Sequence, residues 1–128
     1  MQFRGLMISI DHGKGSFLPN SRPEDWPLFA DLGFIEGSTS PEGGNIHVFM
    51  GPSEFSDKAF ICTKEVDGKR FTMLYFGFHS VHEVKMVAAG IYRWDEVVEI
   101  LERPEFEVIS ELRSTGRVSK LEEVVTLS

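Results

Sequence analysis

The sequence predicts a single α+β domain covering residues 1–128, and three observations lead to this prediction. Short apolar or alternating segments of strand type fill the N-terminal part of the chain, and segments with helical periodicity follow them. Strands followed by helices in this way are typical of α+β folds. A chain of 128 residues is also long enough to bury its own core as one domain.

Five strands are predicted from these segments: Phe3–Ile10, Gly33–Ile35, Ile46–Met50, Lys58–Val66 and Arg70–Phe78. Between the second and the third, Gly37–Asn45 is rich in glycine, serine and proline, which favours a loop. Asp67-Gly68 separates the last two strands and is typical of a two-residue hairpin turn.

The C-terminal part predicts helices. Ser80 and Glu83 form a capping box at the start of the first helix, which continues with apolar residues at helical spacing. A second helix is expected at Trp94–Glu102 and ends before Pro104. A short strand at Phe106–Ser110 and a last helix at Val118–Leu127 complete the predicted elements.

Pro19–Leu32 precedes the second strand and is expected to be irregular, with one helical turn that Ser21 caps. Trp26, Leu28 and Phe29 are expected to cover one end of the core.

Charge and composition restrict the classes of function. Thirteen basic and twenty acidic residues give a net charge of −7, which argues against nonspecific nucleic-acid binding and permits a basic protein partner or a site for divalent cations. No apolar run approaches the roughly 18 residues of a membrane helix. The single cysteine, Cys62, is expected to be a buried thiol and fits a reducing compartment. We therefore expect a cytoplasmic protein with no membrane partner.

The stretch Leu32–Pro52 carries the most specific motif of the chain. It contains Gly33-Phe34-Ile35, a loop with Glu42-Gly43-Gly44, then His47 and the ending Val48-Phe49-Met50-Gly51-Pro52. This pattern resembles the central motif of the soluble inorganic pyrophosphatases, and more closely that of small pyrophosphatase-like domains in phage and prophage proteins. In that family a Gly-Phe/Tyr-Ile strand leads to Asp-Gly-Asp-x-x-Asp-Val, and the phage forms end in Phe-Ile-Gly-Pro. Glu42 stands at the first of these aspartates, Gly44 at the second and His47 at the third.

Two further segments extend the resemblance. Asp11 matches an acid that ends the family's first strand, and Lys14-Gly15-Ser16 match the Lys-Gly-Ser turn that follows. Asp67 and Lys69 match an acid and a lysine of a later hairpin. The resemblance implies a twisted, mainly antiparallel sheet of five or six strands, curled into a small barrel, with two or three flanking helices.

The resemblance also implies residue roles for a metal-dependent hydrolysis of pyrophosphate. Asp11, Glu42 and Asp67 would be catalytic, and Mg²⁺ or Mn²⁺ would be held by Glu42, Asp67 and His47. The phosphate ligands would be Lys14, Gly15, Ser16, Gly43, Gly44, His47 and Lys69. The turn at Lys14 has merit of its own, because glycines allow a close backbone approach and lysine supplies a positive charge.

Glycine and histidine at two of the aspartate positions predict a degenerate active site. We therefore expect a protein that acts through binding, with a basic host or phage protein as its partner. Two alternatives stay open: a divergent hydrolase of phosphoanhydrides such as pyrophosphate, and a module that binds a phosphorylated ligand without turnover.

Overall fold

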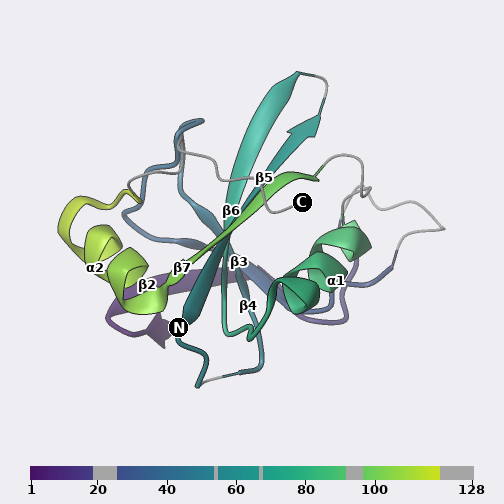
Figure 1. Cartoon of the computed structure of the whole chain (residues 1–128), viewed down its shortest axis with the longest axis horizontal. Helices are drawn as coiled ribbons and strands as arrows, with labels where there is room; N and C mark the ends of the chain where they lie inside the picture. The colour runs from purple at the N-terminus through teal and green to yellow at the C-terminus, as the bar shows by residue number, and fades with distance from the viewer. Residues whose placement is uncertain (19–25, 54, 67, 92–96, 119–128) are drawn as a thin grey trace.

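A computed structural model describes residues 1–18, 26–53, 55–66, 68–91 and 97–118. Within these residues the chain forms a curled sheet of seven strands with two helices beside it (Figure 1). The elements are β1 (Gln2–Phe3), β2 (Leu6–His12), β3 (Asp31–Ile35), β4 (His47–Met50), β5 (Lys58–Val66), β6 (Lys69–Phe76), α1 (Val81–Ile91), β7 (Val97–Pro104) and α2 (Glu105–Thr115). The α+β class is as predicted. The sheet has more strands than the five or six expected.

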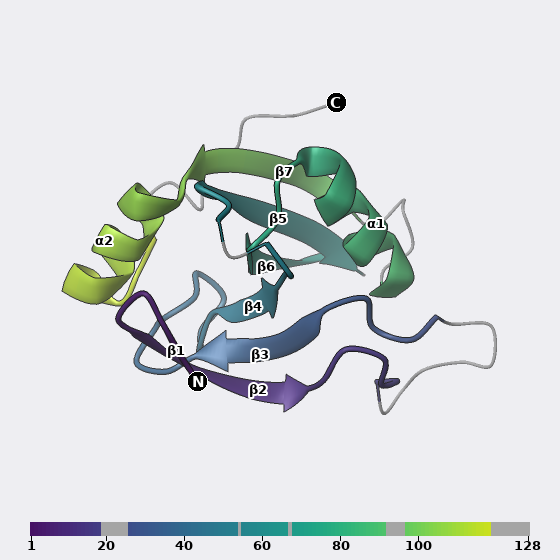
Figure 2. The same cartoon turned by 90° about the horizontal axis from the view of Figure 1, so that it is seen from below.

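The strand order is β1-β2-β3-β4-β6-β5-β7. All neighbouring strands pair antiparallel except β4 and β6, which run parallel. The parallel pair arises because the chain leaves β4, forms β5 on the far side, and returns through a hairpin to place β6 in between. Figure 2 shows the resulting curl, in which β5 and β7 arch over β2 and β3. The sheet is thus a half-barrel rather than a closed barrel.

Two separate cores lie on the two faces of this sheet. Helix α2 packs against one face through Val108, Ile109 and Leu112, all buried. Helix α1 packs against the other through Val84 and Val87. Strands β4, β5, β6 and β7 contribute to both cores, because successive side chains of a strand point to opposite faces. The inner strand β6 ends in five consecutive buried residues, because each of its faces is covered: Thr72, Met73, Leu74, Tyr75 and Phe76.

The glycines of the central motif allow close backbone contacts. A Cβ atom on Gly33 would lie 2.1 Å from the carbonyl oxygen of Ser9 on β2. Gly51 and Gly77 follow the parallel strands β4 and β6, and each would meet the other's carbonyl oxygen, at 2.4 and 2.6 Å. No side chain larger than hydrogen fits at these distances. The Gly-Pro ending of the motif therefore has a structural function in this chain.

Two predicted local features are confirmed. The amide of Glu83 donates a hydrogen bond to Ser80 Oγ at 3.3 Å, and Glu83 Oε2 accepts one from the amide of His79 at 3.2 Å, so α1 begins as expected. Strands β5 and β6 form the expected hairpin, in which Val66 pairs with Lys69 and Gly68 has a φ of 77°.

The prediction for the segment after α1 is wrong. The expected helix at Trp94–Glu102 is strand β7 where it is described, and the expected strand at Phe106–Ser110 lies within helix α2. Strand β7 is the outer neighbour of β5, and Ile100 and Leu101 contribute to opposite cores. Apolar residues on both faces of a strand imitate the spacing of a helical stripe, which explains the error.

Pro104 acts as the junction of β7 and α2 rather than as a helix end. Its φ of −58° suits the start of a helix, and α2 follows with buried side chains at positions 105, 108, 109 and 112. This spacing of buried residues is typical of a helix and indicates α2 in the sequence. The last helix, predicted at Val118–Leu127, lies outside the described residues from 119 onward, as does the turn predicted at Ser21.

The aromatic residues before β3 are also placed differently from the prediction. Leu28 is buried as expected, but 67% of Trp26 and 38% of Phe29 are exposed, so these two rings do not cover the core. They contact each other with ring centroids 6.2 Å apart. In the described part of the chain, no helix has the length and apolar character needed to cross a membrane.

Candidate functional site

The turn after β2 is held by its own hydrogen bonds. The amide of Lys14 donates to Asp31 Oδ1 at 2.7 Å, and the amide of Gly15 donates to the carbonyl of Leu28 at 2.8 Å. The amide and the hydroxyl of Ser16 both donate to the carbonyl of Gly13, at 3.1 and 2.6 Å. The backbone amides of these three predicted phosphate ligands are therefore already used within the protein. What remains for an anion is the exposed side chain of Lys14, beside a carboxylate.

Serine hydroxyls hold the loop between β3 and β4. Ser38 is buried, and its hydroxyl donates to the carbonyl of Ile35 at 2.5 Å and accepts from the amide of Ile46 at 2.8 Å. Ser40 organises the tip, where the amide of Gly43 donates to its carbonyl at 3.0 Å and its own amide donates to the carbonyl of Gly44 at 2.9 Å. The loop is thus a self-supporting turn.

Positive φ angles explain the glycines at its tip. Gly43 and Gly44 have φ values of 94° and 75°, which glycine adopts readily and other residues rarely do. Glu42 beside them is exposed. The amide of Gly43 is engaged within the turn, so the tip offers fewer backbone donors to a ligand than the motif implies.

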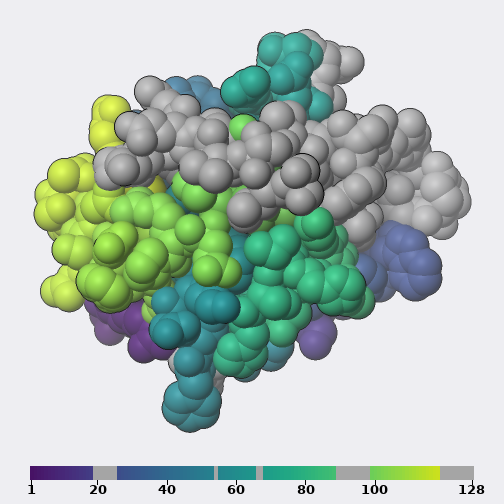
Figure 3. Space-filling view, in the orientation of Figure 1, coloured from purple at the N-terminus to yellow at the C-terminus, as the bar shows by residue number. Residues whose placement is uncertain are grey.

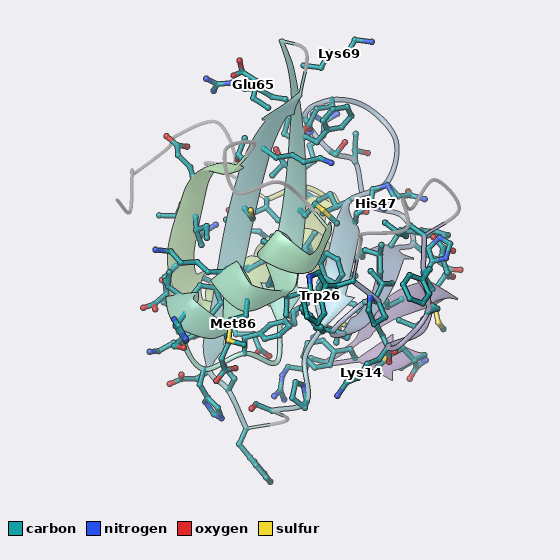
Figure 4. The ribbon with its side chains drawn as sticks, turned by 90° about the vertical axis from the view of Figure 1, so that its right-hand side faces the viewer. Lys14, Trp26, His47, Glu65, Lys69 and Met86 are labelled. Atoms are coloured by element: carbon teal, nitrogen blue, oxygen red, sulfur yellow. The ribbon has the colours of Figure 1, made fainter. Side chains whose placement is uncertain are left out.

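Figure 4 shows that the predicted lysines lie far apart. Lys69 is at the tip of the β5–β6 hairpin and Lys14 is at the opposite end of the molecule, with His47 between them. The pairing of strands agrees: Lys14 follows the end of β2 that lies beside Asp31, whereas His47 pairs with Phe34 toward the other end of β3. The two lysines do not converge on one ligand.

The predicted catalytic acids do not lie together either. Asp11 is exposed at an irregularity of β2, level with the first half of β3, whereas Glu42 lies in the loop beyond the other end of that strand. Asp67 lies outside the described residues. Among the residues that the structure describes, no three His, Cys, Asp or Glu side chains form a group that could hold a metal ion. Asp11, Glu42 and His47 all belong to the residues so searched.

His47 is exposed at the start of β4, on the face of the sheet that carries the α1 core. It pairs with Phe34 on one side and with Met73 on the other. In the described parts of the chain, its imidazole belongs to no group of acidic, cysteine or histidine side chains that could hold a metal ion.

A groove that the sequence did not predict lies along α2. It has a volume of about 1150 Å³ and is lined by Arg4, Phe55, Ser56, Asp57, Glu105, Phe106, Ile109, Ser110, Arg113 and Ser114. These residues come from the turn between β1 and β2, the connection between β4 and β5, and helix α2. In Figure 3 this connection projects below the helix. It is tied to α2 by the amide of Glu105, which donates to the carbonyl of Asp57 at 2.8 Å.

Glu105 is the most unusual residue of this groove. Only 4% of it is exposed, and it forms an ion pair with Arg4 Nε through Oε1. Burial raises the pKa of Glu105, while the Arg4 guanidinium opposes this shift. Its second oxygen, Oε2, is buried without a hydrogen-bond partner among the described residues. An acid in the first turn of a helix is common, so the sequence contained no signal of this burial.

Cys62 is buried on the α1 face, as predicted. Burial raises the pKa of its thiol to about 12, although Lys64 and a hydrogen bond with Tyr75 act in the opposite direction. This thiol is therefore neutral and unreactive at physiological pH.

No family model, curated protein or solved structure matches the chain.

Proposed function

We propose that this protein is a pyrophosphatase-like domain that acts by binding a protein partner and does not hydrolyse pyrophosphate. The observation that carries the proposal is the distribution of the candidate ligand groups, with Lys14 and Lys69 at opposite ends of the molecule (Figure 4). Phosphoryl transfer requires metal ions and cations to act on the same few oxygen atoms. Groups at two ends of a sheet cannot meet this requirement.

The hydrogen bonds of the two motif loops support the same proposal. The amides of Lys14, Gly15, Ser16 and Gly43 have partners within the protein. A loop that binds phosphate presents such donors to the ligand instead. In this chain the family's loops act as structural turns, and the surface around them is available for another function.

The chemistry of the partner follows from charge and from exposed apolar surface. The net charge of −7 favours a basic host or phage protein, because opposite charges accelerate association. The aromatic residues with the largest exposed fractions in the described part of the chain are Phe55 at 93%, Phe106 at 74% and Trp26 at 67%. Exposed rings of this size are typical anchors of protein interfaces.

A phosphate-release assay tests this proposal. The protein is incubated at high concentration with pyrophosphate and Mg²⁺, then with Mn²⁺, beside an Asp11→Ala variant. We expect no release above the buffer rate from either protein, while a known pyrophosphatase added to the same sample gives full release. Turnover that disappears in Asp11→Ala would contradict the proposal and would instead favour the divergent hydrolase.

A titration with pyrophosphate, followed by the amide signals of the protein, tests the third possibility of binding without turnover. Because Lys14 and Lys69 lie apart, we expect no saturable change that depends on both residues. A binding curve that both Lys14→Ala and Lys69→Ala weaken would contradict this expectation.

A further inference from the structure

The groove along α2 has an unsatisfied acceptor at one end. Glu105 lines this end, and its Oε2 atom is buried with no hydrogen-bond partner among the described residues. A buried carboxylate oxygen without a donor is destabilising, and such atoms are rare in folded proteins. Asp57 lines the same end, is exposed, and adds a negative charge beside the ion pair of Arg4 and Glu105. This end of the groove therefore favours a cation.

The other end of the groove carries a cation held in position. Arg113 is exposed, and among the described residues it makes no hydrogen bond or ion pair. Its guanidinium packs over the backbone of Gly5, where a Cβ atom would lie only 3.2 Å from Arg113 Cζ and Nε. The glycine thus makes room for the guanidinium. Eight residues separate Glu105 from Arg113 along α2, which corresponds to about 12 Å.

Apolar surface lies between and beside these charged groups. Phe106 is 74% exposed on α2, and Phe55 is 93% exposed on the connection that joins β4 to β5. Ile109 is buried beneath them in the wall of the groove. Two exposed rings beside a concave surface can enclose one aliphatic or aromatic side chain of a partner.

Resting on the binding function proposed above, we infer that this groove binds an extended peptide segment of the partner protein, with a basic residue toward Asp57 and Glu105, a carboxylate on Arg113, and an apolar side chain between them. An extended chain covers about 12 Å with roughly four residues. The groove's volume of about 1150 Å³ accommodates such a segment.

A displayed library of random linear heptapeptides, selected on the immobilised protein, provides the probe. We expect the enriched peptides to contain a basic, an apolar and an acidic residue at the spacing given above. The best peptide is then synthesised with a fluorescent label, and its affinity is measured by anisotropy. Arg113→Glu and Phe106→Ser should each weaken binding by about tenfold or more. Met86→Ser is the matched control, because Met86 is equally an exposed apolar residue but lies on α1.

A charge exchange gives the sharpest test. A peptide whose acidic residue is replaced by lysine should bind Arg113→Glu better than it binds the unaltered protein. Thermal melts of the variants establish that each retains the fold, which we expect because Arg113 and Phe106 are exposed. Peptides that bind all variants equally, or a library that yields no enriched peptide, would overturn the inference.

Two other outcomes separate this inference from the proposed function. Peptides whose binding is weakened by Trp26→Ser, but not by Phe106→Ser, would contradict the groove as the binding site and leave the proposed protein-binding function intact. If sedimentation shows a dimer that Phe106→Ser dissociates, a second copy of this chain occupies the groove, and the inference of a peptide ligand is wrong. Phosphate release that depends on Asp11 would contradict the proposed function by an independent measurement.

Discussion

At the scale of single residues, three glycines stand where the structure leaves no room for a side chain. Gly33 lies where β2 and β3 approach each other, and Gly51 and Gly77 lie where the parallel strands end. In each case a neighbouring carbonyl oxygen occupies the position that a Cβ atom would take. These three glycines therefore allow neighbouring backbones to pack closely.

Gly33→Ala should therefore destabilise the protein by about 1–3 kcal/mol, because β2 and β3 must move apart to admit the methyl group. Gly13→Ala is the matched control, since its Cβ atom would lie 3.9 Å from Asp31 Oδ1, an ordinary contact. The control should change stability by less than about 1 kcal/mol. Urea denaturation measures both values, and equal midpoints would contradict the argument.

Because the thiol of Cys62 is buried, we expect the protein to lose stability at alkaline pH. Its thiol has a pKa of about 12 in the folded protein against 9.0 for the ordinary group. Between these values the unfolded chain releases this proton while the folded protein retains it, so the free energy of unfolding falls as pH rises from 9 toward 12. Cys62→Ala removes this pH-dependent contribution to the free energy of unfolding. The difference in unfolding free energy between the two proteins, measured across this range, should decrease with pH; parallel curves would refute the assignment.

At the scale of elements, two serine hydroxyls hold the loop between β3 and β4. The Ser38 hydroxyl bonds the carbonyl of Ile35 and the amide of Ile46 at the base of the loop, and the Ser40 hydroxyl donates to the carbonyl of Gly43 at its tip. The loop also docks on the end of α2, where the amide of Thr39 donates to the carbonyl of Gly116 at 2.7 Å. The loop thereby connects the sheet to the helix that lines the groove.

Ser38→Ala should cost about 1–3 kcal/mol of stability, because the buried amide of Ile46 loses its acceptor and the carbonyl of Ile35 loses one of its two donors. Thr39→Ala, in the next position and exposed, should change stability by less than about 0.5 kcal/mol. Thermal unfolding compares the two variants. If both variants melt at the same temperature, Ser38 is not what holds the loop.

The elements also show what the sequence could and could not predict. Strands with turn signals between them were predictable, as the β5–β6 hairpin shows, and so was the cap of α1 at Ser80. Strand β7 was mistaken for a helix because Ile100 and Leu101 face different cores, which removes the alternation of a half-buried strand. The groove was missed because the contacts of Arg4 with Glu105 and of Gly5 with Arg113 depend on the packing of α2 against a turn that is distant in the sequence.

At the scale of the whole molecule, one sheet separates two cores and belongs to both. Leu74 and Phe76 of β6 lie in the core beneath α2, and Met73 and Tyr75 lie in the core beneath α1. Unfolding of β6 would therefore disrupt both cores. The two faces should therefore unfold together.

Leu112→Ala tests this cooperativity, because Leu112 is buried only in the α2 core. The variant should lose about 2–5 kcal/mol. Hydrogen exchange should then accelerate equally for the amides of β6 and for those of α1, on the opposite face. Met86→Ala, which truncates an exposed side chain, should leave exchange unchanged. Faster exchange confined to α2 would show that the two faces unfold separately.

The position of β6 in the middle of the sheet has a consequence for synthesis of the chain. The ribosome releases β1 to β5 first, yet β4 and β5 do not pair with each other and both await β6. Until residue 76 has emerged, Val48 and Phe49 have no neighbouring strand on that side. The nascent chain therefore carries a partial sheet of β1 to β4 and a separate strand β5, and the edges of β4 and β5 that face each other become protected from association with other chains only when β6 is inserted between them.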